Sequence, residues 1–266
     1  MKNFLIVGTQ RTGSSMLAES IGAHPLVACG WEWTQRLPWH CRLEAAKRAL
    51  GGDFSSLRGL DRDHMTEVFD GRQQWLGFRR LFRASDKWRL HPGLCPALWL
   101  DRLEAHLRWL SRRPDIRVIH IVRLDAVEWL KSRALARSTG IRWGRSYPNG
   151  VRVEIPLREA VARLRAKNWV DGRLATLART NPYLQVGYEE LAADPDGVAS
   201  RALRFLDCDA AATPVRPRRL QKQSRARAAE YVENYRQLVD ELRRRELSTA
   251  RFAGVGTHGI RYPASL

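Results

Sequence analysis

The sequence predicts an α/β fold, with a central parallel sheet flanked by helices. Apolar runs of strand length recur along the chain, and most are followed by stretches with helical periodicity. Strands that alternate with helices favour parallel pairing, because each return helix covers one face of the sheet. At 266 residues, the chain has room for a full core as one α/β domain.

The first half of the chain begins with a strand predicted over 3–8 and a helix over 14–22. The helix is expected to end at His24-Pro25, because proline disfavours helical geometry at the residue before it. The segment 26–40 is predicted to be irregular, and it is rich in tryptophan. The further elements predicted here are helices at 41–51, 61–69 and 96–112 and a strand at 75–82.

The second half continues the alternation. A strand at 117–122 leads into a helix that begins near Asp125, and the stretch 140–156 is expected to be an aromatic loop. The remaining predicted elements are a helix at 157–178, a strand at 183–186, a helix at 195–206, a basic linker at 213–223 and a polar helix at about 226–246. We expect 1–266 to form a single domain, with a basic C-terminal helix and tail over about 213–266.

Composition limits the classes of function. No apolar run approaches the length of a membrane span, and Phe4 to Val7 is too short for a signal-peptide core, so we expect a cytoplasmic protein. The four cysteines form no Cys-x-x-Cys pair, which argues against a structural metal. The net charge of +18 favours anionic ligands: a phosphorylated small molecule, nucleic acid or an anionic membrane surface.

The turn between the first predicted strand and helix has the character of a phosphate cradle. Gly8 and Gly13 bracket a short polar turn, and Ser14 and Ser15 open the helix. The turn amides and the helix N-terminus would point at one spot, where the helix dipole favours an anion. The glycine spacing is that of a nucleotide-triphosphate P-loop, but Ser14 stands where that motif needs lysine. The nearest cation is Arg11, so the sequence does not support a γ-phosphate clamp or a magnesium site.

A second candidate phosphate site follows the strand at 117–122. Arg123 comes directly after that strand, and Ser132 lies nine residues further on. Ligands of parallel α/β folds bind beyond the carboxyl ends of the strands. Arginine offers bidentate donors to phosphate oxygens, although an arginine in this place is also often a solvated cap. The phosphate cradle at residues 8–15 strengthens the interpretation of Arg123 and Ser132 as a second phosphate site.

Together, these two segments resemble the cofactor signatures of sulfotransferases, and most closely those of the bacterial carbohydrate-type members. The resemblance continues at 186–191 and at 220–223 before Glu233-Asn234-Tyr235, and it is vague over 53–110. It implies the P-loop-like sulfotransferase fold without a metal. It also implies a donor, 3′-phosphoadenosine 5′-phosphosulfate (PAPS), whose product is adenosine 3′,5′-bisphosphate.

The resemblance implies a role for each matching residue. Arg123 and Ser132 would hold the 3′-phosphate. Arg11 stands where many relatives have a catalytic lysine, and because arginine keeps its proton at neutral pH, we expect it to act only by stabilising charge on the sulfuryl and bridging oxygens. Arg219 and Lys222 are candidates to replace a C-terminal cofactor motif of the cytosolic class. The residues that would wrap the 5′-phosphosulfate are Gln10, Arg11, Thr12, Gly13, Ser14 and Ser15.

Transfer to a hydroxyl needs a base to take its proton. Glu32 is the first candidate, because relatives of the carbohydrate type place a carboxylate in this region and neighbouring tryptophans could desolvate it. His24 and His40 are rivals, since histidine titrates in the right range, although His24 is also placed to cap a helix. His120 lies within a buried strand and is expected to be a core histidine. The tryptophan-rich segment 31–39 and the loop 140–150 are candidates for an acceptor pocket, for core packing or for a dimer surface.

The sequence therefore predicts an enzyme that transfers a sulfuryl group from PAPS to a hydroxyl of a small-molecule or glycan acceptor, such as a carbohydrate, glycolipid or natural product. Two other functions stay open. A P-loop small-molecule kinase is disfavoured by the missing lysine. A non-enzymatic, basic nucleic-acid-binding protein fits the charge, but no nucleic-acid motif supports it. Peripheral contact with an anionic membrane and a homodimer also stay open.

Overall fold

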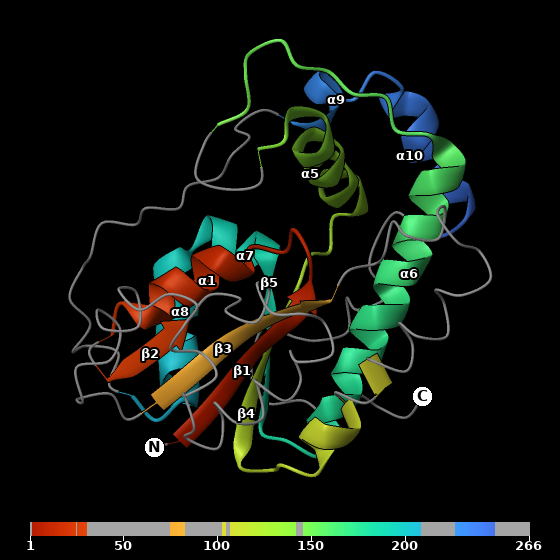
Figure 1. The fold of residues 1–266 in the computed structure, drawn as a ribbon. Coiled ribbons are helices and arrows are strands. Elements are labelled where there is room, and N and C mark those ends of the chain that lie inside the picture. The colour runs from red at the N-terminus through yellow and green to blue at the C-terminus, as the bar shows by residue number, and fades with distance from the viewer. Residues whose placement is uncertain are drawn as a thin grey trace.

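A parallel sheet of five strands forms the centre of the computed structural model, in the order β2-β3-β1-β4-β5 (Figure 1). The strands are β1 (Lys2–Thr9), β2 (Val27–Gly30), β3 (Trp75–Phe82), β4 (Ile116–Val122) and β5 (Tyr183–Gly187). The structure describes residues 2–24, 26–30, 75–82, 103–104, 107–141, 146–208 and 227–247. The predicted fold class, an α/β fold with a central parallel sheet flanked by helices, is confirmed.

Helices lie on both sides of this sheet, as expected for parallel strands joined by crossovers. The elements are α1 (Ser14–Gly22), α5 (Ala126–Thr139), α6 (Leu157–Ala175), the 3-10 helix η3 (Thr176–Arg179), α7 (Tyr188–Ala193), α8 (Pro195–Phe205), α9 (Ala228–Tyr231) and α10 (Tyr235–Arg244). Residues 103–104 and 107–111 are also helical, within the helix predicted at 96–112. The helix predicted at 157–178 is correct up to Ala175, and its last turn tightens into η3.

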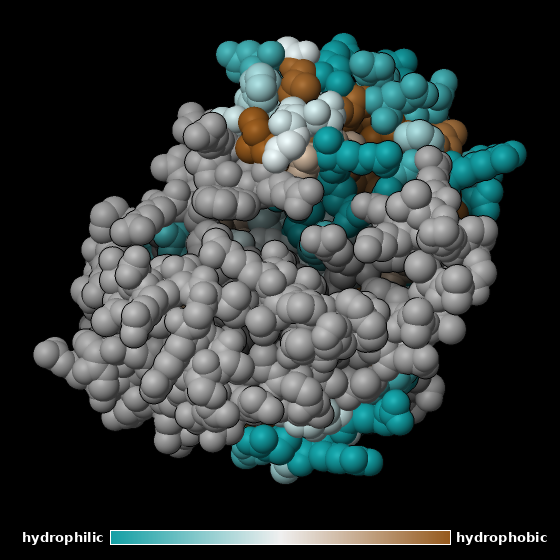
Figure 2. Space-filling view, viewed as in Figure 1, coloured by the Kyte–Doolittle hydropathy of each residue, from teal (hydrophilic) through white to brown (hydrophobic). Residues whose placement is uncertain are grey.

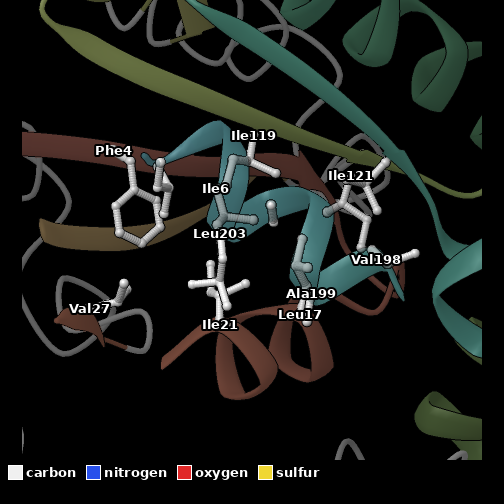
Figure 3. Packing of buried hydrophobic residues seen from close by; sticks show 14 of the residues in the cluster. Phe4, Ile6, Leu17, Ile21, Val27, Ile119, Ile121, Val198, Ala199 and Leu203 are labelled. Atoms are coloured by element: carbon white, nitrogen blue, oxygen red, sulfur yellow. The ribbon is translucent and has the colours of Figure 1, made fainter. Parts of the chain in front are cut away.

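One face of the sheet packs on α1 and α8. Side chains of a strand alternate between faces, so Phe4 and Ile6 of β1 point to the same side, and both are fully buried. Leu17 and Ile21 of α1 and Leu203 of α8 close over them (Figure 3). This packing fixes the N-terminus of α1 at the carboxyl end of β1.

The other face of the sheet packs on α6 and contains a buried polar cluster. Lys167 Nζ lies 2.7 Å from Asp171 Oδ2, and His120 Nδ1 of β4 lies 2.6 Å from Tyr183 Oη of β5. His120 Nε2 is 3.8 Å from Asp171 Oδ1, and both side chains are 1% exposed. Burial alone would raise the pKa of Asp171, but Lys167 and His120 outweigh it, and the net shift is downward. The prediction of a core histidine at 120 is confirmed.

The expectation of irregular structure throughout 26–40 is wrong at its start. Residues 27–30 form β2, an edge strand that pairs with β3 from Val27 opposite Trp75 to Gly30 opposite Phe78. Four residues are too few to show the period of a strand, so tertiary pairing decides their conformation. The tryptophan-rich segment 31–39 lies outside the described residues.

The single polar helix expected at about 226–246 is also wrong. Two short helices replace it, because Val232 is fully buried and forms a parallel bridge with Val153. Asn234 secures the break: its side chain accepts from Ile155 N at 3.1 Å and donates to Ile155 O at 2.8 Å. On the face seen in Figure 2, the surface in this region is mostly hydrophilic, with smaller hydrophobic patches.

Several predictions fall on residues that the structure does not describe. These are the helices at 41–51 and 61–69, the basic linker at 213–223 and the tail beyond 247. Within the described ranges, no helix is long and apolar enough to span a membrane. The division of 1–266 into one domain, a cytoplasmic location, a homodimer and contact with an anionic membrane stay predictions.

Candidate functional site

The turns that follow β1, β4 and β5 meet at the carboxyl edge of the sheet. Gly8 of β1 pairs with Ile121 of β4, and Val122 of β4 pairs with Gly187 of β5. A Cβ at Gly8 would lie 2.5 Å from the Ile121 carbonyl oxygen, so only glycine permits the approach of these two strands. The register therefore places the residues after Thr9, Val122 and Gly187 next to one another.

The loop between β1 and α1 is held in an unusual conformation. Arg11 and Gly13 both have positive φ, at 68° and 81°, which turns the chain sharply into the helix. Thr12 Oγ1 donates to Thr9 O at 2.8 Å, so the Thr12 hydroxyl braces the loop. From the outside, Trp129 Nε1 of α5 donates to Gln10 O at 2.8 Å. Bonds from within the loop and from α5 thus hold its backbone in this conformation.

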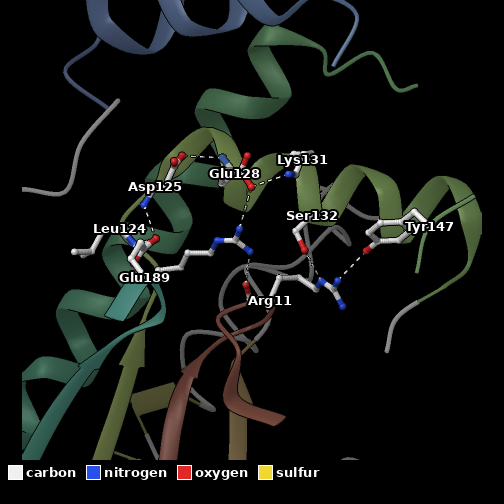
Figure 4. Close-up of polar contacts among 9 residues, drawn as sticks. Arg11, Leu124, Asp125, Glu128, Lys131, Ser132, Tyr147 and Glu189 are labelled. Carbon is white, nitrogen blue, oxygen red and sulfur yellow. Dashed lines mark hydrogen bonds and ion pairs between the residues drawn. The ribbon is translucent and has the colours of Figure 1, made fainter. Parts of the chain in front are cut away.

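Arg11 reaches across the site to two hydroxyl groups. Its Nε donates to Ser132 Oγ at 3.0 Å, and its Nη2 donates to Tyr147 Oη at 2.9 Å (Figure 4). Burial lowers the pKa of Arg11; the phenol of Tyr147 acts in the opposite sense, and the nearby guanidinium of Arg123 lowers it further. Two guanidinium groups therefore share a poorly solvated region, which an anion would stabilise.

Arg123 is the second of these guanidinium groups and is only 5% exposed. Its Nη1 donates to Arg11 O at 3.3 Å, and its Nη2 lies 3.4 Å from Glu128 Oε2. Lys131 Nζ approaches the same Glu128 oxygen at 2.7 Å. The Arg123 Cζ lies 4.1 Å from the centroid of the Tyr188 ring. Arg123 thus connects the β1 loop, helix α5 and the start of α7, rather than forming a solvated cap.

Glu189 of α7 orients the segment that carries Arg123. Its carboxylate accepts from Leu124 N at 3.1 Å and from Asp125 N at 3.0 Å (Figure 4). Asp125 in turn caps α5, since its Oδ1 accepts from Glu128 N at 2.8 Å. These backbone bonds set the direction in which β4 leads into α5, and so where Ser132 lies.

The structure brings part of the predicted site together. Gln10 to Ser15, Arg123 and Ser132 all lie at this edge of the sheet. Arg11 and Ser132, expected to serve opposite ends of the donor, are in direct contact. His24 lies beyond the far end of α1, roughly 14 Å along the helix from the loop. There it is 2% exposed, and its Nδ1 accepts from Leu26 N at 3.2 Å. The predicted residues outside the described part of the chain are Glu32, His40, Arg219 and Lys222.

Sequence reasoning missed several residues that build the site. Tyr147 belongs to the loop predicted for the acceptor, but its phenol joins the arginine cluster instead. Tyr188 and Glu189 lie in a segment that resembles the family, but they carried no predicted role. Trp129 shows no signal beyond an apolar position in a helix, because its bond to Gln10 depends on how α5 packs.

A family model described as "Sulfotransferase family" matches residues 3–212, which include the loop, Arg123, Ser132 and Tyr188. The chain belongs to the sulfotransferase family. A search of curated proteins found no match to this sulfotransferase. In the described parts of the chain, no group of three or more His, Cys, Asp or Glu side chains is placed to hold a metal ion.

Solved structures of bacterial sulfotransferases are similar to the chain at low identity. One, from Alicyclobacillus acidocaldarius, is 18% identical with a TM-score of 0.43, and the match covers 92% of this chain and 94% of that one. The sulfotransferase domain of the Synechococcus PCC 7002 olefin synthase is 14% identical with a TM-score of 0.41, covering 97% and 90% of the two chains. A sulfotransferase from Mycobacterium avium is 14% identical with a TM-score of 0.43, covering 92% and 76%.

Proposed function

We propose that this sulfotransferase uses PAPS as donor and transfers the sulfuryl group to a hydroxyl of a carbohydrate, glycolipid or natural product, as in the bacterial carbohydrate-type branch. The observation that carries the proposal is the convergence of Arg11, Arg123 and Ser132 at the carboxyl edge of β1 and β4. Two cations and a hydroxyl beside an amide-rich loop suit a ligand with two separate phosphates.

The loop would hold the 5′-phosphosulfate. The first turn of α1, from Ser14 onward, has backbone N–H groups without partners in the helix, and these groups favour an anion. Gly13 has no side chain to intrude on the ligand. The Thr12 hydroxyl is engaged with Thr9, so Thr12 would contribute through its backbone amide. Ser15 would add a hydroxyl at the mouth of the helix.

The other end of the site would hold the 3′-phosphate. Arg123 offers its guanidinium there, and Ser132 its hydroxyl, both held by the packing of α5 against the β1 loop. Arg219 and Lys222 remain candidates for further contacts with this phosphate. A P-loop kinase would need a lysine in place of Ser14. This chain has a serine there instead, and that serine is buried, with 3% of its surface exposed.

In the reaction, PAPS supplies an activated sulfuryl group whose S–O bond to the phosphate breaks as the acceptor oxygen bonds to sulfur. Arg11 would stabilise the negative charge that develops on the sulfuryl and bridging oxygens. Glu32 would take the proton of the acceptor hydroxyl. His40 is the rival base; His24 is disfavoured because it lies at the opposite end of α1 from the loop.

A thermal-shift and titration experiment tests the donor. We expect adenosine 3′,5′-bisphosphate to stabilise the protein, and ATP and GTP to have little effect. Arg123→Ala should weaken binding of the bisphosphate about ten- to hundredfold, as expected for a charged hydrogen-bond partner. Arg137→Ala is the control, because the Arg137 side chain is 67% exposed on α5, the helix that follows Arg123. Unchanged affinity in Arg123→Ala would refute the 3′-phosphate assignment, and magnesium-dependent turnover of ATP would favour a kinase.

A further inference from the structure

Lys167 and Asp171 form a buried ion pair to which the proposed reaction assigns no role. The two residues lie one turn apart on α6 and are 4% and 0% exposed, with Lys167 Nζ 2.7 Å from Asp171 Oδ2. Removing two charges from water costs free energy that their attraction only partly returns, so apolar residues of similar volume often fill such a place at least as well. Packing alone therefore does not explain why a lysine stands at this position.

The Lys167 ammonium also approaches the indole ring of Trp129, on α5. Its Nζ lies 5.9 Å from the ring centroid, within the range of about 6 Å over which a cation is attracted to an aromatic face. Trp129 is fully buried, and this attraction is stronger where water is excluded. The stem of lysine is flexible, so the ion pair with Asp171 is what fixes the position of the ammonium. Lys167 thus links α6 to the tryptophan of α5.

The indole of Trp129 in turn bonds the loop between β1 and α1. Its Nε1 is the only hydrogen-bond donor of the side chain, and it lies 2.8 Å from Gln10 O. A hydrogen bond weakens steeply as its angle departs from a straight line, so the tilt of the ring decides whether this bond forms. A contact that fixes the ring therefore also fixes the Gln10 carbonyl, at the start of the turn that leads to Gly13.

The ion pair is anchored to the sheet as well. His120 Nε2 of β4 lies 3.8 Å from Asp171 Oδ1, and His120 Nδ1 lies 2.6 Å from Tyr183 Oη of β5. A continuous series of contacts therefore leads from β4 and β5 through Asp171, Lys167 and Trp129 to the loop. Such a series can transmit the effect of a buried residue to a site that it does not touch.

We propose that Lys167 is a positioning residue: by holding the indole of Trp129, it keeps the loop at Gln10 in the conformation that binds the 5′-phosphosulfate of the donor. The inference rests on the proposed function, because it takes this loop as the site of the 5′-phosphosulfate. Lys167 acts without touching the donor, so its removal should weaken donor binding only as long as Trp129 is present to transmit the effect.

A double-mutant cycle with Trp129→Phe tests the inference. Lys167→Met together with Asp171→Leu removes the cation and leaves no unpaired carboxylate, so the fold should persist. Calorimetric titration of this paired variant with adenosine 3′,5′-bisphosphate should show binding about two- to fivefold weaker than in the wild type, the effect of one cation–π contact. In the Trp129→Phe protein, which lacks Nε1, the same two substitutions should cause no further loss.

Two single substitutions and a control pair accompany the cycle. Lys167→Gln keeps a donor for Asp171 but has no charge, and it should weaken binding by the same factor. Lys167→Arg restores the cation and should bind as the wild type does, and equal losses in the two would count against a role for the charge. Glu159→Leu with Arg163→Met removes another ion pair of α6 with the same spacing and should leave the affinity unchanged. A matching loss in this control would overturn the inference, because any change in α6 would then suffice.

The outcomes separate this inference from the proposed function. If the wild type binds the bisphosphate and the paired variant of Lys167 and Asp171 binds it equally well, the role of Lys167 is overturned and the proposed function stands. An equal loss with and without Trp129→Phe also overturns it, because the ion pair would then act by another route. If the wild type does not bind the bisphosphate, the proposed function fails and the inference fails with it.

Discussion

The guanidinium of Arg123 stacks on the ring of Tyr188, with its central carbon 4.1 Å from the ring centroid. The same ring fills the space beside Gly13, where an added Cβ would lie 2.6 Å from Tyr188 Cδ2. One aromatic side chain thus contacts both the loop proposed to hold the 5′-phosphosulfate and the arginine proposed to hold the 3′-phosphate. A change on either side of this ring should affect both ends of the site.

The first prediction concerns Gly13→Ala. The substitution should destabilise the protein by about 2–4 kcal/mol, because it adds backbone strain at φ 81° and a clash with Tyr188. Binding of adenosine 3′,5′-bisphosphate should be lost as the ring is displaced. Gly140→Ala separates the two causes, since Gly140 has φ 72° but a Cβ added there would meet nothing within 4 Å. In that control, urea unfolding should show a loss of stability from backbone strain alone, about 1–2 kcal/mol. Equal losses of stability in Gly13→Ala and Gly140→Ala would rule out the role of Tyr188.

The second prediction concerns Trp129→Phe. This variant keeps a ring in the core but loses the bond from Nε1 to Gln10 O, which is 2.8 Å long. We expect the loop to loosen and the affinity for the bisphosphate to fall about fivefold or more, the effect of about 1 kcal/mol. Trp169→Phe serves as comparison, because Trp169 is 41% exposed on α6. An unchanged dissociation constant in Trp129→Phe would show that the loop keeps its shape without this bond.

The third prediction concerns the buried cluster under α6. Asp171→Asn leaves Lys167 without its carboxylate partner and should lower the free energy of unfolding by about 3–5 kcal/mol at neutral pH. The pKa of Asp171 is lowered in the folded protein, so its contribution is present above the unfolded pKa, about 3.9, and is lost as the pH falls through the folded value. The difference between wild type and variant should therefore shrink in acid.

Asp115→Asn provides a surface comparison for this cluster. Asp115 also has a lowered pKa, caused first by its hydrogen bond with Arg113, but its side chain is 54% exposed. Loss of the Asp115 carboxylate should lower the free energy of unfolding by less than about 1 kcal/mol, as for other exposed ion pairs. Denaturant unfolding at several pH values measures both variants, and an Asp171→Asn protein as stable as Asp115→Asn would disprove a stabilising buried pair.

The fourth prediction concerns the proposed base. Glu32→Gln should reduce turnover about 10²- to 10⁴-fold, the contribution of a general base, while binding of adenosine 3′,5′-bisphosphate stays unchanged. His40→Asn should keep most of the activity. Sulfuryl transfer is followed with PAPS and a panel of hydroxyl acceptors. A fully active Glu32→Gln enzyme, or an inactive His40→Asn enzyme, would move the role of base away from Glu32.

The part of the fold that could be predicted consists of elements with a strong local signal. β1 contains the apolar run Phe4 to Val7, and β4 is apolar except at Arg117 and His120. α1 follows a glycine turn that indicates its start. By contrast, β2 has only four residues, and the break before α10 depends on Asn234 bonding Ile155, 79 residues away in sequence. Local pattern contains no information about such contacts, so both were predicted wrongly.

The candidate site also contains residues that the sequence could predict and contacts that it could not. The loop, Arg123 and Ser132 could be found because they stand at fixed places after strands. The contact between Arg11 and Ser132 joins residues 121 positions apart and depends on the direction of α5, which Glu189 sets from helix α7. Tyr147 could be recognised as part of an aromatic loop, but not as a partner of Arg11, because the loop has no periodicity that says which way its ring points.

The bridge between Val153 and Val232 has a practical consequence for how this protein is handled. The family match stops at residue 212, yet α9 and α10 share a hydrophobic cluster with Tyr147 and with α5, which carries Ser132. A recombinant fragment trimmed to the matched region would retain the loop, both arginines and both hydroxyls. It would nevertheless lack the support on which Tyr147 and α5 rest, so expression designs should extend at least through residue 247.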